Sequence, residues 1–321
     1  MTLHTKAATV LATLTAALAA TIATSVVPTP TNAAENPTMT QMPKPVKSGH
    51  EAINGVNYYY AVYGKGEPLL LLHGGLGQIE MFGPNLATLA KSREVIGVDL
   101  QGHGRTDLGN RDMSLIDMGA DLGVLLKKLG YQKVDVLGYS FGAGAAFQLA
   151  IQQPQAVRRL VLVSGIYSTD GFYPEMMPQQ AAVSGKMAEQ MKETPMYKSY
   201  VAVAPHPEDF PKLLDKMGEY MRKPYDWSTY VKKLTMPTML IYGDSDMMRP
   251  ESIVKFYQML GGGLKDAGWQ REHMSANRLA ILPNVTHYEM GVAPQMVETA
   301  LPFLNGYPRA GTWSDQVSGT K

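Results

Sequence analysis

Short apolar runs separated by polar and glycine-rich turns recur along most of the chain. A continuous apolar run bounded by turn residues is typical of a strand buried on both faces of a parallel sheet. Several intervening stretches carry apolar residues every three or four positions, which favours amphipathic helices. The two patterns together predict an α/β protein. The runs predicted to be strands cover residues 68–72, 94–99, 134–137, 159–165, 237–243 and 278–283.

Residues 114–129 give the clearest helical pattern, with their leucines and one methionine on a single face. Ser114 and Asp117 have the spacing of a capping box, and Gly130 is a typical stop. A second helix is predicted after residue 140, where small residues allow close packing on the sheet, and a third over 294–304.

The start of the folded region shows a different pattern. Residues 49–63 hold two β-prone runs separated by Asn54-Gly55, which predicts an antiparallel hairpin with a tight turn. Three consecutive tyrosines follow this turn, and no basic groove accompanies them. We therefore interpret them as part of a sheet edge and not as a platform for stacking bases.

The regular pattern stops between residues 166 and 234, which hold no apolar strand but many methionines, aromatic residues and prolines. We predict that this segment is a helical cap inserted over the sheet, with some of its methionines and tyrosines lining a ligand site and most holding the cap together. The core then comprises residues 49–165 and 235–306, and residues 307–321 form a polar tail.

The first residues resemble a targeting segment. A basic start precedes an uncharged stretch rich in Ala, Leu, Val and Thr, and small residues follow near residues 31–34. Residues 1–34 are therefore expected to be a secretory signal peptide, with residues 35–48 as a linker. A retained membrane anchor is the alternative, because the uncharged stretch is long enough to span a bilayer. After cleavage we expect an exported protein, periplasmic or secreted, with no membrane contact.

Composition excludes several functions. The formal net charge is +1 without a cluster of Lys or Arg, which argues against a nucleic-acid partner. The sequence has no cysteine, so disulfides and thiol catalysis are ruled out. No group of residues has the spacing of a metal site, and neither a metal nor an organic cofactor is expected.

Candidate chemistry centres on residues 138–142, which read Gly-Tyr-Ser-Phe-Gly after a predicted strand and before a predicted helix. This is the context of the nucleophile elbow, a strained turn that exposes a serine hydroxyl between two small residues. Ser140 is therefore the candidate nucleophile. A glycine-rich connection with an ordinary serine is the alternative interpretation.

An acid and a histidine follow at later strand ends, in the order serine, acid, histidine. Asp246 lies far enough beyond its strand to reach a histidine, whereas Asp244 is better placed to stabilise the turn. His287 follows the last predicted strand and is the candidate base. His103 lies between glycines in a tight turn and is interpreted as structural.

Residues 73–77 read His-Gly-Gly-Leu-Gly and follow a buried strand, which places backbone N–H groups at the sheet edge where α/β proteins bind ligands. Together with the elbow, the two aspartates and the histidine loop, this stretch resembles the α/β-hydrolase superfamily over roughly residues 49–305. The resemblance implies an α/β-hydrolase fold in which Ser140, His287 and Asp246 form a catalytic triad.

The resemblance also implies an oxyanion hole formed by the backbone N–H groups of Phe141 and Gly75, with Leu76 as an alternative to Gly75. The haloalkane dehalogenases and epoxide hydrolases of the superfamily carry aspartate at the elbow, where this chain has serine. The expected activity is hydrolysis of a small to medium apolar carboxylic ester through an acyl-enzyme. Lactonase, amidase, perhydrolase and carbon–carbon bond hydrolase activities use the same triad, and a ligand-binding protein on a hydrolase scaffold is the alternative of another class.

Overall fold

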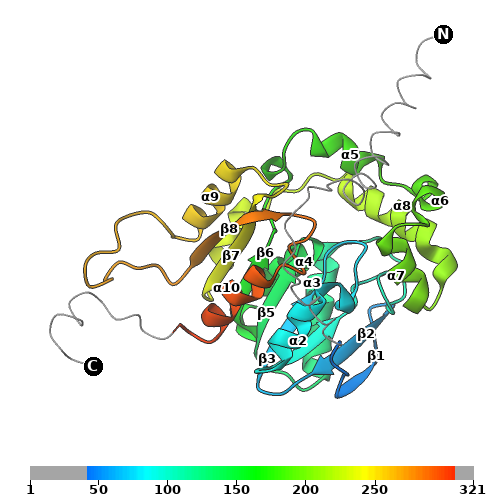
Figure 1. Ribbon diagram of the computed structural model, residues 1–321, viewed down its shortest axis with the longest axis horizontal. Coiled ribbons are helices and arrows are strands. Elements are labelled where there is room, and N and C mark those ends of the chain that lie inside the picture. The colour runs from blue at the N-terminus through cyan, green and yellow to red at the C-terminus, as the bar shows by residue number, and fades with distance from the viewer. Residues whose placement is uncertain (1–41, 308–321) are drawn as a thin grey trace, which may run out of the picture. The chain divides into compact units, whose positions relative to one another are not determined.

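The computed structural model describes residues 42–307, so the expected signal peptide and nearly all of the expected tail lie outside the described residues. The described chain forms an eight-stranded sheet with strand order β1-β2-β4-β3-β5-β6-β7-β8 (Figure 1). Strands β1 and β2 pair antiparallel, β2 pairs antiparallel with β4, and all further pairs are parallel. The strands are β1 Lys47–Ile53, β2 Val56–Tyr63, β3 Glu67–Leu72, β4 Arg93–Val98, β5 Val134–Tyr139, β6 Val157–Val163, β7 Thr238–Ser245 and β8 Arg278–Thr286.

The described helices flank this sheet or lie in the segment between β6 and β7. The α-helices are α2 Pro84–Ala90, α3 Leu115–Lys128, α4 Phe141–Gln152, α5 Met176–Ala182, α6 Ala188–Met191, α7 Pro195–Val203, α8 Phe210–Met221, α9 Pro250–Met259 and α10 Pro294–Leu304. Short 3-10 turns occur at η1 Ile79–Phe82, η2 Pro154–Ala156, η3 Thr169–Gly171, η4 Gly185–Met187, η5 Pro207–Asp209 and η6 Ser228–Lys233.

Two hydrophobic clusters cover the two faces of the sheet, and the continuous apolar strands supply residues to both. In β3, Leu70 and Leu72 belong to the cluster under α3, α4 and α9, whereas Leu69 and Leu71 belong to the cluster under α2 and α10. Side chains alternate between the faces of a strand, so a strand covered on both faces is apolar at every position. The predicted α/β fold with a mostly parallel sheet is therefore confirmed.

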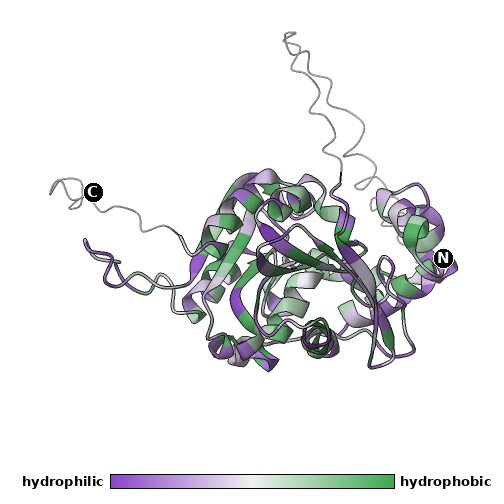
Figure 2. Ribbon diagram, turned by 90° about the horizontal axis from the view of Figure 1, so that it is seen from below, coloured by the Kyte–Doolittle hydropathy of each residue, from purple (hydrophilic) through white to green (hydrophobic). Residues whose placement is uncertain are grey.

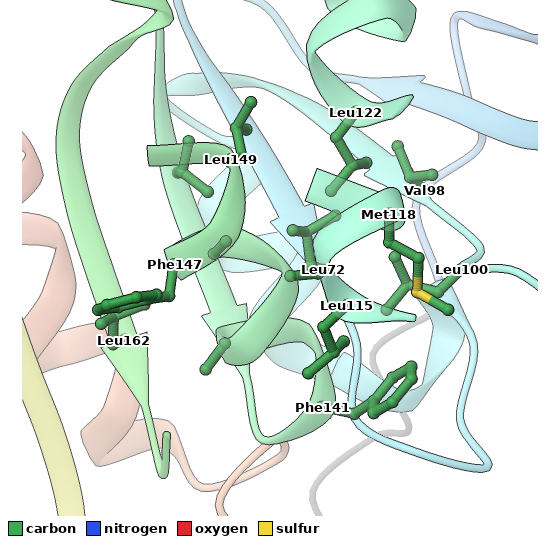
Figure 3. Packing of buried hydrophobic residues seen from close by; sticks show 14 of the residues in the cluster. Leu72, Val98, Leu100, Leu115, Met118, Leu122, Phe141, Phe147, Leu149 and Leu162 are labelled. Atoms are coloured by element: carbon green, nitrogen blue, oxygen red, sulfur yellow. The ribbon is translucent and has the colours of Figure 1, made fainter. Parts of the chain in front are cut away.

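The contact between the sheet and its helices is close-packed (Figure 3). The residues drawn there include Leu72, Val98 and Leu162 from the sheet, Leu115, Met118 and Leu122 from α3, and Phe141, Phe147 and Leu149 from α4. The helix ribbons carry both hydrophilic and hydrophobic stretches, as expected for helices with one face on a sheet (Figure 2).

Local sequence signals account for some of the element boundaries. The predicted hairpin forms, and both Asn54 (φ 48°) and Gly55 (φ 80°) adopt the positive φ that its tight turn requires. The Ser114 side chain accepts a hydrogen bond from the Asp117 N–H and caps α3 at its N-terminus. The segment from 166 to 234 holds α5 to α8 and none of the eight strands.

Some boundaries differ from the prediction. The first strand begins at Lys47, two residues inside the expected linker, and β8 continues to Thr286 instead of ending at residue 283. The segments η1, α2 and α9 were not predicted. Helix α2 spans only two turns, too few for a 3.6-residue period to be visible, and α9 buries only Ser252, Ile253 and Phe256.

The amino ends of the parallel strands share a cluster of charges. Arg93 Nη1 lies 2.5 Å from Asp135 Oδ2, and both side chains are buried. Arg158 Nε donates to Asp135 Oδ1 over 2.9 Å, and Arg93 Nη2 donates to Asn305 Oδ1 over 2.7 Å. Asp135 therefore pairs with the guanidinium groups of both Arg93 and Arg158 and joins β4, β5 and β6. Within residues 42–307, no helix has the length and apolar character that a membrane span requires.

We predict that Asp135→Asn lowers the free energy of unfolding by about 3–5 kcal/mol, because it leaves the buried Arg93 without its counter-charge. The measurement is urea denaturation followed by circular dichroism. Glu67→Gln is the matched control: Glu67 also pairs with Arg158 but is largely exposed, so its loss should change the value by about 0.5 kcal/mol or less. Equal effects of the two changes would contradict the assigned role of Asp135.

Candidate active site

The chain reverses sharply at Ser140, between the end of β5 and the start of α4. Ser140 has φ 53° and ψ −114°, a strained conformation for a residue with a side chain, and its N–H donates to the Val163 carbonyl over 2.8 Å. A side chain at Gly138 would begin 2.3 Å from the Gly142 carbonyl oxygen. A side chain at Gly142 would begin 2.5 Å from the carbonyl oxygens of Leu72 and His73. The turn therefore requires both glycines.

His287 directly follows β8, and Ser140 Oγ lies 2.9 Å from its Nε2. The hydroxyl of Tyr139 donates to the His287 backbone carbonyl. Farther along the same loop, Asn85 Nδ2 donates to the carbonyls of Gly291 and Ala293 over 2.9 and 3.0 Å. Two side chains from distant parts of the sequence thus hold the loop that carries the histidine.

Asp246 follows β7, and its Oδ1 lies 2.8 Å from His287 Nδ1. The same oxygen accepts the Met247 N–H, while Oδ2 accepts the Ser164 hydroxyl over 2.5 Å and the Gly243 N–H over 3.3 Å. Burial alone would raise the pKa of Asp246, but these bonds, led by the one from His287, hold the pKa below its usual value. The carboxylate is therefore ionised and fully hydrogen-bonded.

Asp244, the other candidate acid, is exposed and accepts the N–H of Asn284 over 3.0 Å. It stabilises the contact between the ends of β7 and β8 and does not touch the histidine. The three expected side chains Ser140, His287 and Asp246 instead form one continuous chain of hydrogen bonds.

This geometry fixes the direction of proton movement. Because the Asp246 carboxylate only accepts, Nδ1 of His287 carries a proton and Nε2 presents a lone pair to the Ser140 hydroxyl. The arrangement can therefore take a proton from Ser140 and stabilise the imidazolium that results, which is what nucleophilic attack by a serine needs.

The glycine loop after β3 lies against the elbow. A side chain at Gly74 would begin 3.5 Å from Ser140 Cβ, and one at Gly75 would begin 3.8 Å from Phe141 Cβ. In the part of the chain that the structure describes, the N–H groups of Gly75, Leu76 and Phe141 donate to no protein acceptor. Leu76 adopts φ 57° in a turn closed by a hydrogen bond from Gly77 to Gly74. The expected oxyanion residues thus lie together beside Ser140.

Two buried histidines support this loop. His73 Nδ1 donates to the Gly74 carbonyl over 2.7 Å, and His73 Nε2 accepts the Leu100 N–H over 3.0 Å. His103 packs 5.3 Å from the His73 ring and 5.6 Å from the Phe141 ring, and its Nε2 has no partner among the described residues. Burial lowers the pKa of His73 to about 3 and that of His103 to about 4. Both histidines are neutral, and His103 takes no part in the Ser140 chain of hydrogen bonds.

Several residues that hold the site in place were not predicted from the sequence. Ser164 and Tyr139 contact the acid and the histidine loop, and Asn85 comes from the unpredicted helix α2. The position of Ser164 in the sequence could have indicated its role. It is a polar residue directly after β6, at the sheet edge where the other loops meet. Among residues 42–307 there is no group of His, Cys, Asp and Glu side chains that suits a metal ion.

Comparison with known proteins gives one family and several relatives. A family model described as alpha/beta hydrolase fold matches residues 67–195. An uncharacterized protein of Mycobacterium tuberculosis (strain ATCC 25618 / H37Rv) is 36% identical over 112 residues, which is 35% of this chain and 33% of that protein. A soluble epoxide hydrolase of Corynebacterium sp. (strain C12) is 34% identical over 118 residues, 36% of this chain and 41% of that protein. The chain thus matches less than half the length of these relatives.

The solved structure of carboxylesterase CesB (YbfK) from Bacillus subtilis superposes with a TM-score of 0.59 at 18% identity, covering 82% of this chain and 92% of that one. At this identity the likeness concerns the fold, and it extends beyond the region that the family model matches. Residues 67–195 thus match the α/β-hydrolase family, and the mostly parallel sheet with the serine elbow at its edge has the fold of that superfamily.

Proposed function

We propose that this protein is a serine hydrolase that cleaves a carboxylic ester through an acyl-enzyme, and that it acts as a carboxylesterase. The observation that carries the proposal is the hydrogen bond of 2.9 Å from Ser140 Oγ to His287 Nε2, with Asp246 holding the opposite ring nitrogen. A serine that only caps a helix does not need this arrangement.

In the proposed first step, the Ser140 proton moves to His287 Nε2 while Oγ attacks the ester carbonyl carbon. The negative charge that develops on the carbonyl oxygen is stabilised by the N–H groups of Phe141 and Gly75. The bond to the alcohol then breaks, and His287 returns the proton to the departing oxygen. Water hydrolyses the acyl-enzyme by the same steps, with His287 as the base.

The relatives support hydrolysis in general and leave several bonds as candidates, since one is an epoxide hydrolase and one structural neighbour is a carboxylesterase. Lactones, amides and activated carbon–carbon bonds would be attacked by the same hydroxyl. We favour a small to medium apolar ester because the buried residues of helix α8 in the cap include Phe210, Leu213 and Met217. Export to the periplasm or the medium, directed by residues 1–34, is part of the proposal.

We predict that Ser140→Ala lowers the hydrolysis of p-nitrophenyl esters by about 10⁴-fold or more, because nothing else replaces the nucleophile. Reaction with a fluorophosphonate probe should label the wild-type protein and not this variant. Ser92→Ala, on an exposed serine, is the matched control and should keep full activity and labelling. A wild-type protein that neither reacts with the probe nor hydrolyses any ester would identify a ligand-binding protein instead.

A second prediction concerns Ser164, which donates to Asp246 Oδ2. This bond stabilises the ionised carboxylate, so Ser164→Ala should raise the pKa of Asp246. As the pH is lowered, the activity of the variant should begin to fall at a higher pH than the activity of the wild-type protein. We expect the acid limb of kcat/KM to move to higher pH, because loss of the donor destabilises the ionised form of Asp246.

The control for this variant is Ser168→Ala, since Ser168 caps η3 and does not contact the acid. Its pH profile should match that of the wild-type protein. If Ser164→Ala lowers the rate equally at every pH, Ser164 acts through packing and not through the charge of Asp246.

A further inference from the structure

The backbone around His287 is held by side chains on both sides of this residue. On one side, the Tyr139 hydroxyl donates to the His287 carbonyl. Tyr139 directly precedes Ser140 in the chain, so the residue beside the proposed nucleophile fixes the main chain of the proposed base. The Tyr139 side chain is buried, and burial raises the pKa of its phenol above the usual value. The hydroxyl therefore keeps its proton and acts as a donor.

The ring of Tyr139 lies against both the glycine loop and the histidine loop. A side chain at Gly74 would begin 2.9 Å from Tyr139 Cε1, and one at Gly291 would begin 3.5 Å from the same atom. The centroids of the Tyr139 and His287 rings are 5.6 Å apart, with an interplanar angle of 37°. A buried ring packed against two glycine backbones has little freedom to move, so its hydroxyl is a fixed point of attachment for the histidine.

On the other side, Thr286 and Glu289 enclose the histidine with reciprocal hydrogen bonds. The Thr286 N–H donates to Glu289 Oε1 over 2.7 Å, and the Thr286 hydroxyl donates to Oε2 of the same carboxylate. The Tyr288 N–H donates to Thr286 Oγ1 over 3.2 Å. This is the pattern of a capping box, Thr-x-x-Glu, in which His287 follows the threonine. The turn is therefore closed without the histidine side chain, which is left for the triad.

The imidazole of His287 has to serve two oxygens during the proposed acylation. Its Nε2 takes the proton of the Ser140 hydroxyl and then gives it to the ester oxygen that leaves. A leaving group that is stable as an anion, such as p-nitrophenolate, can depart without this proton. A more basic one, such as p-methoxyphenolate, depends on it. A small error in the orientation of the ring should therefore slow the second kind of ester more than the first.

We propose that Tyr139 and Glu289 are positioning residues that hold the His287 ring where it can protonate the leaving oxygen of the ester. This inference rests on the proposed ester hydrolysis at Ser140 and adds that the two residues permit cleavage of esters with basic leaving groups. Tyr139 acts through the His287 carbonyl and Glu289 acts through the Thr286 N–H, so neither needs to contact the substrate.

The test compares p-nitrophenyl butanoate with p-methoxyphenyl butanoate, two esters of the same acid and of similar size. The ratio of their kcat/KM values does not depend on the amount of folded protein, so a purely structural role would leave this ratio unchanged. Tyr139→Phe keeps the ring but removes the donor to the His287 carbonyl. We expect this variant to shift the ratio about tenfold in favour of the p-nitrophenyl ester, the order of effect of one hydrogen bond.

Glu289→Ala should shift the ratio in the same direction, and it decides the matter if Tyr139→Phe does not fold. Glu289 is exposed, so its loss should leave the fold intact. One matched control is Tyr58→Phe, which removes another buried phenol donor, here to Asp121. The other is Glu298→Ala, at an exposed position of α10. Both controls should keep the wild-type ratio.

The inference is overturned for either residue whose folded variant keeps the wild-type ratio, and for both residues if the controls shift the ratio equally. These results leave the proposed function intact as long as the wild-type protein hydrolyses the p-nitrophenyl ester and Ser140 reacts with the fluorophosphonate. Absence of both hydrolysis and labelling would instead refute the function itself.

Discussion

The strained backbone at Ser140 is the constraint on which the rest of the site depends. Turning from β5 into α4 within one residue exposes the hydroxyl, and it forces α4 to approach so closely that Gly142 touches the carbonyls at the end of β3. The glycine loop that continues β3 is therefore brought beside the nucleophile by the same turn. The two large helix-covered faces of the sheet hold this arrangement in place.

The two ends of the parallel strands use charge for different purposes. At the amino ends, Asp135 joins Arg93 and Arg158 in a cluster whose role is to neutralise buried charges and tie strands together. At the carboxyl ends, Asp246 meets only a histidine, a serine and two N–H groups, so its charge is directed at one imidazole. In the first case a carboxylate stabilises the fold, and in the second it orients a proton acceptor.

Much of this was accessible from the sequence because the responsible signals are local. The apolar run ending at Leu72 predicted a central strand, and residues 138–142 predicted the elbow. Ser164 and Asp246 are 82 positions apart, and their contact follows only from the pairing of β6 with β7. The apolar face of α8, which includes Leu213 and Met217, has a helical period, but the position of this face over the loops after β3 and β4 follows only from the fold.

The two neutral histidines under the glycine loop make the stability of the fold depend on pH. An unfolded histidine takes up a proton near pH 6.5, whereas folded His73 and His103 resist protonation down to about 3 and about 4. Their contribution to stability is therefore complete above pH 6.5 and declines as the pH falls below it. Acidification would therefore act on the fold through the two rings beneath the proposed oxyanion loop, so that the site and the stability of the protein share one sensitivity to pH.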